Sequence, residues 1–166
     1  MVQNYRAHPE LLEVPSKLFY DNKLVPRADA ARTHALLAWS EAWLAKERVQ
    51  RDGAAPSPLI FDSIIGADER ENTSPSFFNL TEVWRVGQYV RSLVAHGVSA
   101  ADIGVISPYR QQCNKIKRYL QKKLSLQKIR VGSVEEFQGQ EKLVILISTA
   151  RSSSAFVSSD LKHAIG

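Results

Sequence analysis

Several features that mark particular protein classes are scarce or absent in this sequence. Cys113 is the single cysteine among 166 residues, which excludes an internal disulfide framework and fits a reducing compartment. The four histidines are scattered and lack the spacing of metal ligands, so we expect no structural metal. No secretory signal and no span of about twenty apolar residues occurs, so we expect a soluble protein without membrane association.

A glycine followed by lysine is also missing from the chain. The Gly-x-x-x-x-Gly-Lys-Ser/Thr loop, which surrounds nucleotide phosphates and supplies a magnesium ligand, is therefore absent. We do not expect the chain to hold ATP on its own in the usual way. The apolar and charged fractions are those of one ordinary folded domain, and the net charge of +5 makes an anionic partner plausible.

Hydrophobic periodicity predicts helices and strands in alternation, which is typical of a parallel α/β sheet. The predicted helices cover residues 8–19, 29–50 and 79–96, and a fourth begins at Ser107 and Pro108; the predicted strands cover 59–61, 103–106, a short stretch near 131, and 143–147. The first helix is expected to be interrupted at Pro15, with Leu11, Leu12, Leu18 and Phe19 on its apolar side. Asp29 is expected to cap the second helix, and Asn79, with Glu82 three residues on, the third. The apolar residues at helical spacing in these two helices are Leu36, Leu37, Trp39, Trp43 and Leu44, and Val83, Val86, Val90, Leu93 and Val94. Residues 51–58 are predicted to form a loop and residues 66–76 an exposed excursion. The last strand, five large apolar residues in a row, is expected to be covered on both faces.

The segment between the last two predicted strands is rich in polar residues. Ser, Glu, Gln and Gly crowd residues 131–141, and Gly132 and Gly139 permit a backbone geometry or a close approach that a side chain would forbid. The alternative is a simple connection between strands. The density of polar groups beside a buried strand favours a binding site.

Three segments, in order along nearly the whole chain, resemble one helicase family. They are Asn-Tyr-Arg-Ala-His-Pro at 4–9, Ile-Ser-Pro-Tyr-Arg-Gln-Gln at 106–112, and Val-Gly-Ser-Val-Glu-Glu-Phe-Gln-Gly-Gln-Glu at 131–141. The last is similar to motif V of superfamily 1B helicases of the Up-frameshift type, in the form found in the Armitage and Moloney-leukemia-virus-10 types of small-RNA silencing. The resemblance implies a RecA-like parallel sheet flanked by helices, with residues 1–166 forming the second RecA-like domain of a helicase core.

The resemblance also implies residues that touch a nucleotide. Tyr5 would stack on the adenine, and Arg6 would act as an arginine finger on the γ-phosphate, its planar charge offsetting negative charge in the transition state. Glu141 would bind the ribose hydroxyl, and Gly139 would let the backbone pass close to the nucleotide. The residues alone allow blander roles, because an exposed Tyr-Arg pair is common and Glu141 could pair with Lys142 or a neighbouring arginine.

A second set of residues is predicted to contact RNA. The helix after residue 107 starts at the carboxyl end of a strand, where open α/β sheets bind ligands and where helix N–H groups can meet a phosphate. By resemblance, Ser133 and the backbone at Val134 contact an RNA phosphate, and Gln138 couples the two sites. The predicted RNA-binding residues are Ser107, Pro108, Tyr109, Arg110, Ser133 and Val134. The alternative for Ser107 is a plain N-cap.

Positive charge gathers in the helix that follows. Residues 110–130 contain eight basic side chains and no acidic one. A helix face that binds a nucleic-acid strand and a helix face that is only exposed to solvent both fit this pattern. Asp68-Glu69 resembles the end of a magnesium-binding Walker B strand, but it lies in a charged stretch and is not predicted to bind magnesium. The role of Arg151 is left open.

The resemblance accounts for the missing phosphate loop. A first RecA-like domain, expected before Met1, would bind most of ATP with Mg²⁺, and the arginine-bearing motif VI is expected after Gly166. The chain is then a truncated domain, inactive as an ATPase alone. The parent is expected to be a cytoplasmic 5′-to-3′ RNA helicase, in ribonucleoprotein granules among other sites. Its expected partners are single-stranded RNA, its own first RecA-like domain, and Argonaute or Piwi proteins. The alternative is a non-catalytic platform for RNA or protein.

Overall fold

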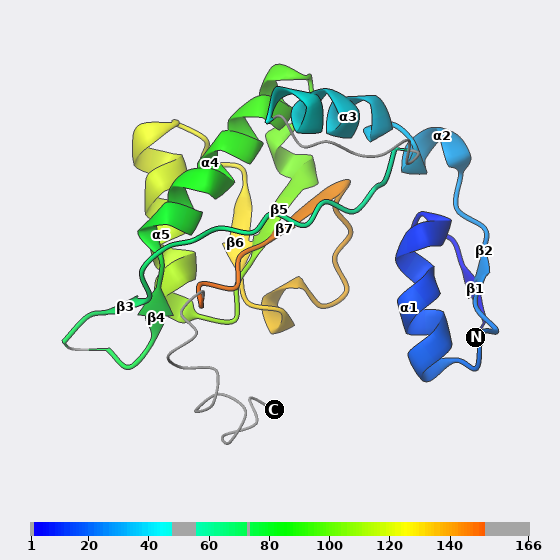
Figure 1. Cartoon of the computed structure of the whole chain (residues 1–166), viewed down its shortest axis with the longest axis horizontal. Coiled ribbons are helices and arrows are strands. Elements are labelled where there is room, and N and C mark those ends of the chain that lie inside the picture. The colour runs from blue at the N-terminus through cyan, green and yellow to red at the C-terminus, as the bar shows by residue number, and fades with distance from the viewer. Residues whose placement is uncertain (1, 48–55, 73, 152–166) are drawn as a thin grey trace. The chain divides into compact units, whose positions relative to one another are not determined.

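The computed structural model of the chain describes residues 2–47, 56–72 and 74–151. The chain divides into two units, Met1–Asp62 and Ser63–Gly166, which are described separately (Figure 1). The second unit contains the predicted parallel sheet. The predicted helix end near residue 50 and most of the loop predicted at 51–58 lie outside the described residues.

The sheet of the second unit has three parallel strands. They are β5 (Ile103–Ile106), β6 (Arg130–Gly132) and β7 (Val144–Ile147), in the order β6-β5-β7. The central strand β5 is apolar and carries the fully buried Ile103 and Val105. The predicted strands at 103–106 and 143–147 are therefore confirmed, as is their parallel arrangement.

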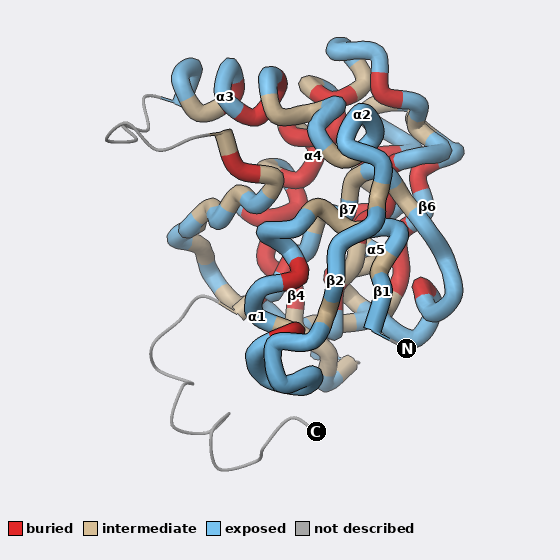
Figure 2. Tube along the Cα trace, turned by 90° about the vertical axis from the view of Figure 1, so that its right-hand side faces the viewer, coloured by how far each residue is buried: buried red, intermediate tan, exposed pale blue. Residues whose placement is uncertain are grey.

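Two helices supply a large part of the core of this unit. Helix α4 (Leu80–Ala95) packs against α5 (Arg110–Lys123), and their buried stretches are red in Figure 2. Apolar residues at helical spacing, Val90 and Leu93 on α4 and Ile116 and Leu120 on α5, are fully or almost fully buried. The predicted helix over residues 79–96 is confirmed almost to the residue. This sheet with its flanking helices is the predicted α/β architecture.

The prediction that β7 is covered on both faces is wrong. Alternation places Ile145 and Ile147 on the face where Gly104 of β5 also lies, opposite Ile103 and Val105. Phe137, from the short 3₁₀ helix η2 (Glu135–Phe137), covers Gly104 on that face. It does not shield the end of the strand, and Ile147 is 69% exposed. Five apolar residues in a row show which side chains can be buried but not what covers them.

A short antiparallel ribbon precedes α4. Strands β3 (Glu69–Arg70) and β4 (Phe77–Phe78) pair, and β4 packs on α5 (Figure 1). The exposed excursion predicted over residues 66–76 is thus partly ordered into this ribbon. Phe78 is buried, which gives the ribbon an apolar contact with the body of the unit.

A buried hydrogen-bond network joins the start of α4, the start of α5 and the segment after β7. The Gln112 amide accepts from Asn79 N at 2.8 Å and donates to Ser148 Oγ at 2.8 Å. Ser148 Oγ donates to the Glu82 carboxylate at 2.6 Å. All four side chains are buried, so each depends on the others for its hydrogen bonds.

The same network explains the N-terminus of α4. Asn79 Oδ1 accepts from Thr81 N at 3.0 Å and Glu82 N at 3.2 Å, which confirms Asn79 as the predicted N-cap. The Asn79 N–H, which the Glu three residues on often binds in a capping box, is bound by Gln112 instead. Glu82 is thereby released to turn inward toward Ser148.

The first unit holds β1 (Gln3–Asn4), α1 (Pro9–Phe19), β2 (Val25–Pro26), α2 (Ala30–Thr33) and α3 (Leu37–Lys46). Strands β1 and β2 pair in parallel. Helix α1 runs through Pro15 without a break, so the predicted interruption is wrong: the proline ring removes one N–H donor but leaves the helix continuous. Of the predicted apolar side, Leu12 is buried, whereas Leu11, Leu18 and Phe19 are exposed.

The single helix predicted over residues 29–50 is divided in two. Asp29 caps α2 as predicted, its Oδ1 accepting from Ala31 N at 2.9 Å. Thr33 Oγ1 then donates to the Asp29 carbonyl at 3.1 Å, and the His34 ring lies 2.8 Å from the Ala30 carbonyl. Both carbonyls also accept their helical backbone N–H groups, and the helix ends where Ala35 N donates to the Arg32 carbonyl at 3.4 Å, three residues back instead of four. Trp39 and Trp43 on α3 are buried and stacked, as their spacing predicts.

The strand predicted at residues 59–61 is wrong. These residues are not part of any described strand, and the Phe61 side chain is 92% exposed. A short apolar run after prolines gives no information about whether a neighbouring strand is available to pair with it.

Replacing Gln112 with the near-isosteric Met is expected to destabilise the second unit. The buried Asn79 N–H loses its acceptor and Ser148 loses its donor, so the opening free energy should fall by at least about 2 kcal/mol. Native-state hydrogen exchange of the α4 and β5 amides measures the opening free energy of the second unit within the intact chain. Gln121→Met, at an exposed position of α5, is the control and should change little. Equal protection in both variants would contradict the role of the network.

Candidate nucleotide-binding and nucleic-acid-binding residues

A turn in the first unit presents Tyr5 and Arg6 at the surface. Asn4 Oδ1 accepts from Arg6 N and Ala7 N, both at 2.9 Å, which fixes the backbone locally as an Asx turn. His8 then caps α1 by accepting from Glu10 N at 3.2 Å, and proline occupies the first helical position. Tyr5 and Arg6 are both exposed, and the Tyr5 hydroxyl donates to Gln3.

The buried side chain of Phe137 anchors the polar stretch after β6, residues 133–141, to the sheet. Its ring is buried, and the Arg130 guanidinium lies 5.7 Å from the ring centroid. Gly139 has φ +77° and open space around it, so the chain needs glycine here for its backbone conformation rather than for close packing. Gln138, Gly139 and Glu141, the remaining predicted residues of this stretch, are exposed.

Ser133 already has an acidic neighbour. Its hydroxyl donates to the carboxylate of Glu135, and this hydrogen bond lowers the pKa of the exposed Glu135. A phosphate that approached the Ser133 hydroxyl would therefore compete with a carboxylate for the same donor. Val134 beside it is exposed. The contacts of Ser133 and Val134 with RNA remain predictions.

Ser107 is fully buried at the end of β5. Its N–H donates to the Gly132 carbonyl at 3.1 Å, and its hydroxyl accepts from Tyr109 N at 3.4 Å. The hydroxyl thus closes a local turn before α5 and is inaccessible in this conformation. The N-cap of α5 is Tyr109, so the alternative prediction that Ser107 is the N-cap is wrong, and the contact of Ser107 with RNA remains a prediction. Helix α5 begins at Arg110, because Tyr109 is still extended at φ −104°, so the prediction that Pro108 starts the helix is wrong.

The two predicted RNA-binding segments lie side by side. Ile106 pairs with Gly132 in the parallel ladder, and the Ser107–Gly132 hydrogen bond extends that pairing by one residue. Residues 108–110 and 133–134 therefore follow neighbouring strands at the same edge of the sheet. Pro108 and Arg110 are exposed and Tyr109 is half-buried. The predicted nucleotide-side residues, by contrast, are divided between the units, with Tyr5 and Arg6 in the first and Gly139 and Glu141 in the second.

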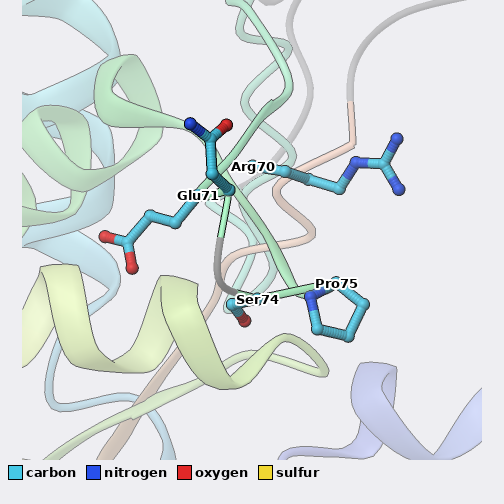
Figure 3. A pocket seen from close by; sticks show the side chains of 5 residues that line it. Arg70, Glu71, Ser74 and Pro75 are labelled. Carbon is cyan, nitrogen blue, oxygen red and sulfur yellow. The ribbon is translucent and has the colours of Figure 1, made fainter.

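The basic helix is partly neutralised by an acid distant in sequence. Glu71, on the loop of the β3–β4 ribbon, forms an ion pair with Lys115 and accepts from Gln111 Nε2 at 3.1 Å. Glu71 also lines a shallow hollow with Arg70, Asn72, Ser74 and Pro75 (Figure 3). The absence of acidic residues from the helix sequence therefore overstates its free positive charge. The other basic side chains that extend from α5 and the residues after it are mostly exposed: Lys117, Arg118, Lys122, Lys123, Lys128 and Arg130.

Arg151, whose role the sequence leaves open, has a structural partner. Its Nε lies 3.1 Å from Asp68 Oδ2, and the two side chains are 13% and 1% exposed. The guanidinium also lies 4.0 Å from the centroid of the Phe77 ring. Asp68 is therefore one partner of a buried ion pair. This structural role is consistent with the prediction that Asp68-Glu69 is not a magnesium-binding Walker B sequence. No local pattern could reveal a pair separated by 83 residues.

The backbone before Arg151 turns sharply. Ala150 has φ +61°, a left-handed conformation that alanine rarely adopts, and Arg151 N donates to the Thr149 carbonyl at 2.7 Å. Glu82 holds this turn by accepting from Ala150 N at 3.0 Å. The buried carboxylate thus directs Arg151 toward Asp68.

Other candidate chemistry is limited within the described parts of the chain. Across residues 2–47, 56–72 and 74–151, no group of three or more His, Cys, Asp or Glu side chains could hold a metal ion. None of the helices in these ranges is long and apolar enough to cross a membrane. Burial raises the pKa of the Cys113 thiol, which donates to the Ser107 carbonyl at 3.4 Å and is not poised as a nucleophile.

The parallel sheet with its flanking helices places the chain in the class of α/β RecA-like helicase domains. Residues 1–166 match the family described as an AAA domain, and the chain belongs to this family, which is of the Up-frameshift-like superfamily 1B type. It is 41% identical over 179 residues to the putative helicase mov-10-B.1 of Danio rerio, covering 100% of this chain and 17% of that protein.

Two other relatives carry RNA helicase in their names. The RNA helicase Mov10l1 of Homo sapiens is 48% identical over 156 residues, covering 92% of this chain and 12% of that protein. The probable RNA helicase armi of Drosophila melanogaster is 36% identical over 169 residues, covering 100% of this chain and 14% of that protein. The chain thus spans less than a fifth of the length of these relatives, and the resemblance predicted from the three sequence segments is confirmed.

Substituting Ser133 with Ala is expected to raise the pKa of Glu135 toward its ordinary value. The wild-type hydrogen bond stabilises the ionised carboxylate, so its contribution to stability is present above the unfolded-state pKa of Glu135. That contribution is lost as the pH falls through the lowered folded-state pKa. An NMR titration of the Glu135 carboxyl carbon measures the shift. Ser99→Ala, which removes a capping hydroxyl elsewhere in the unit, should leave Glu135 unchanged. The same pKa in Ser133→Ala as in the wild type would refute the assignment.

Proposed function

We propose that the chain is the second RecA-like domain of an ATP-dependent RNA helicase that moves 5′ to 3′ along a single strand. The observation that carries the proposal is that residues 108–110 and 133–134 follow neighbouring paired strands and emerge at one edge of the sheet, in a domain of a helicase family. Two similar proteins are named RNA helicases, which supports RNA as the strand.

On the RNA side, exposed groups meet at the carboxyl edge of parallel strands, where this kind of sheet binds ligands. Pro108 and Arg110 are exposed, and the half-buried Tyr109 between them has its ring edge-on to Phe77, which suits a sugar-phosphate backbone and a stacked base. Ser133 and the Val134 backbone supply donors from the next strand. Gln138 would couple this edge to the nucleotide.

On the nucleotide side, the residues present suit contacts with the adenine, the ribose and the γ-phosphate of ATP. Exposed Tyr5 and Arg6 on a fixed turn suit an adenine and a γ-phosphate, and the exposed Gly139 and Glu141 suit a ribose. The chain has no Gly-Lys pair, and its described residues hold no acidic cluster for Mg²⁺, so the first RecA-like domain would bind the phosphates and metal. When bound, ATP with Mg²⁺ supplies the phosphoryl group whose hydrolysis releases free energy. Arg6 would offset the charge on its oxygens.

We base the proposed cellular setting on the resemblance to the Armitage and Moloney-leukemia-virus-10 types of helicase. The parent protein would work in small-RNA silencing, including the piRNA branch, with Argonaute or Piwi proteins as partners. Such a protein would act in the cytoplasm, with ribonucleoprotein granules among its sites.

Replacing Arg6 with Ala in the parent protein should abolish ATP hydrolysis while RNA binding persists. Loss of an arginine finger lowers turnover by about a thousandfold or more. Arg6→Lys should not restore activity, because a point charge cannot reproduce the planar fork. RNA-stimulated phosphate release and RNA binding are measured side by side. Arg91→Ala, at an exposed arginine of α4, is the control. Unchanged turnover in Arg6→Ala would falsify the finger assignment.

Binding of single-stranded RNA to the chain should weaken steeply as salt rises. Each phosphate neutralised contributes a slope of about −0.7 in log affinity against log salt. Arg110→Ala should reduce the magnitude of the slope by about one such contribution, whereas Arg91→Ala should leave it intact. Fluorescence anisotropy over a salt series gives both slopes. A flat wild-type response would count against the edge of the sheet as a strand contact.

A further inference from the structure

The β3–β4 ribbon sorts its charged side chains onto opposite faces. Successive residues of a strand point to alternate faces, so Arg70 lies on the face opposite Glu69 and Glu71. Arg70 pairs across the ribbon with Phe77 and its guanidinium lies 4.7 Å from that ring. Figure 3 shows Arg70 and Glu71 extending in opposite directions.

The acidic face is occupied by the basic helix. Glu71 pairs with Lys115, whose ammonium also lies 4.5 Å from the ring centroid of Phe78, the cross-ribbon partner of Glu69. This arrangement fixes the ribbon on α5. By this alternation, Glu69 and Glu71 are turned away from the face that carries Arg70.

The opposite face is a cationic and aromatic cluster formed by Arg70, Phe77, Tyr109 and Arg151. Phe77 lies close to two guanidinium groups, those of Arg70 at 4.7 Å and Arg151 at 4.0 Å from its centroid. The charge of Arg151 is balanced by the buried Asp68, whereas Arg70 is exposed. Arg70 therefore contributes positive charge at the surface of this cluster.

The cluster adjoins the predicted RNA-binding segment. The Tyr109 ring meets the Phe77 ring edge-on at 5.9 Å, and Gln111 N donates to Ser76 Oγ at 3.1 Å, so the ribbon is joined directly to the start of α5. A single-stranded RNA that contacted residues 108–110 would therefore meet this face of the ribbon next to them.

We propose that this face of the β3–β4 ribbon is a further RNA contact, in which Arg70 binds a backbone phosphate and the aromatic pair Phe77 and Tyr109 supports a stacked base. The inference rests on the proposed RNA binding of residues 108–110. Single-stranded nucleic acid is favoured over an acidic peptide because the exposed cation lies beside aromatic rings and continues the predicted strand-binding edge.

The test is the affinity of the chain for a fluorescent oligouridine, measured by anisotropy over a salt series. Arg70→Ala is expected to weaken binding about fivefold and to reduce the magnitude of the salt slope by about 0.7, the contribution of one phosphate. The control is Arg91→Ala, which removes the same charge from an exposed position on α4 and should change neither quantity. Circular dichroism should show that both variants fold, because both side chains are exposed.

A second measurement reports on the aromatic pair without a mutation. Photo-cross-linking with 4-thiouridine RNA should label the peptides that contain Phe77 and Tyr109. If the chain binds RNA but Arg70→Ala matches Arg91→Ala and no label reaches residues 69–78, the ribbon contact is overturned and the proposed function stands. If the wild-type chain binds an acidic peptide and no RNA, both the ribbon contact and the RNA side of the proposed function fail.

Discussion

The buried carboxylate of Glu82 is the constraint on which the second unit depends. It accepts hydrogen bonds from Ser148 Oγ and Ala150 N, and Ser148 in turn is bound by Gln112, which also holds the Asn79 N–H. A buried polar group that loses its partner costs more than the bond itself contributes, so these groups act together. Their shared position fixes the starts of two helices against the end of β7.

This constraint reaches the surface through Ala150. The left-handed turn there is strained for a residue with a Cβ atom, and it persists because Glu82 binds its N–H. The turn directs Arg151 onto Asp68 and Phe77. The interior network, the end of the sheet and the ribbon beside Tyr109 are therefore one connected arrangement of polar contacts.

The sequence predicts local structure well where a single element decides it. Asn79 is a cap and Val90 and Leu93 are core residues because of their spacing alone, and the structure agrees. It predicts poorly where other segments decide. Pro15 is tolerated inside a helix, the helix predicted from Asp29 ends already at Thr33, and Ile147 is exposed because little of the described chain covers it.

The candidate site shows the same division. The three sequence segments identify the family and the residue types, and periodicity alone indicates that residues 108–110 and 133–134 follow parallel strands. Their adjacency is decided by strand order β6-β5-β7, which no sequence periodicity encodes. The pairing of Glu71 with Lys115 and of Asp68 with Arg151 likewise changes the charge that the sequence suggests.

The sequence by itself determined α4 with its cap and its buried apolar positions, the cap at Asp29, and the family, because these depend on residues within a few positions of one another. The tertiary structure alone decided which charges are neutralised, which face of the ribbon is cationic, and that Ser107 is buried. These properties depend on groups far apart in the chain that meet only when the sheet and helices pack, since burial and ion pairing are fixed by neighbours in space.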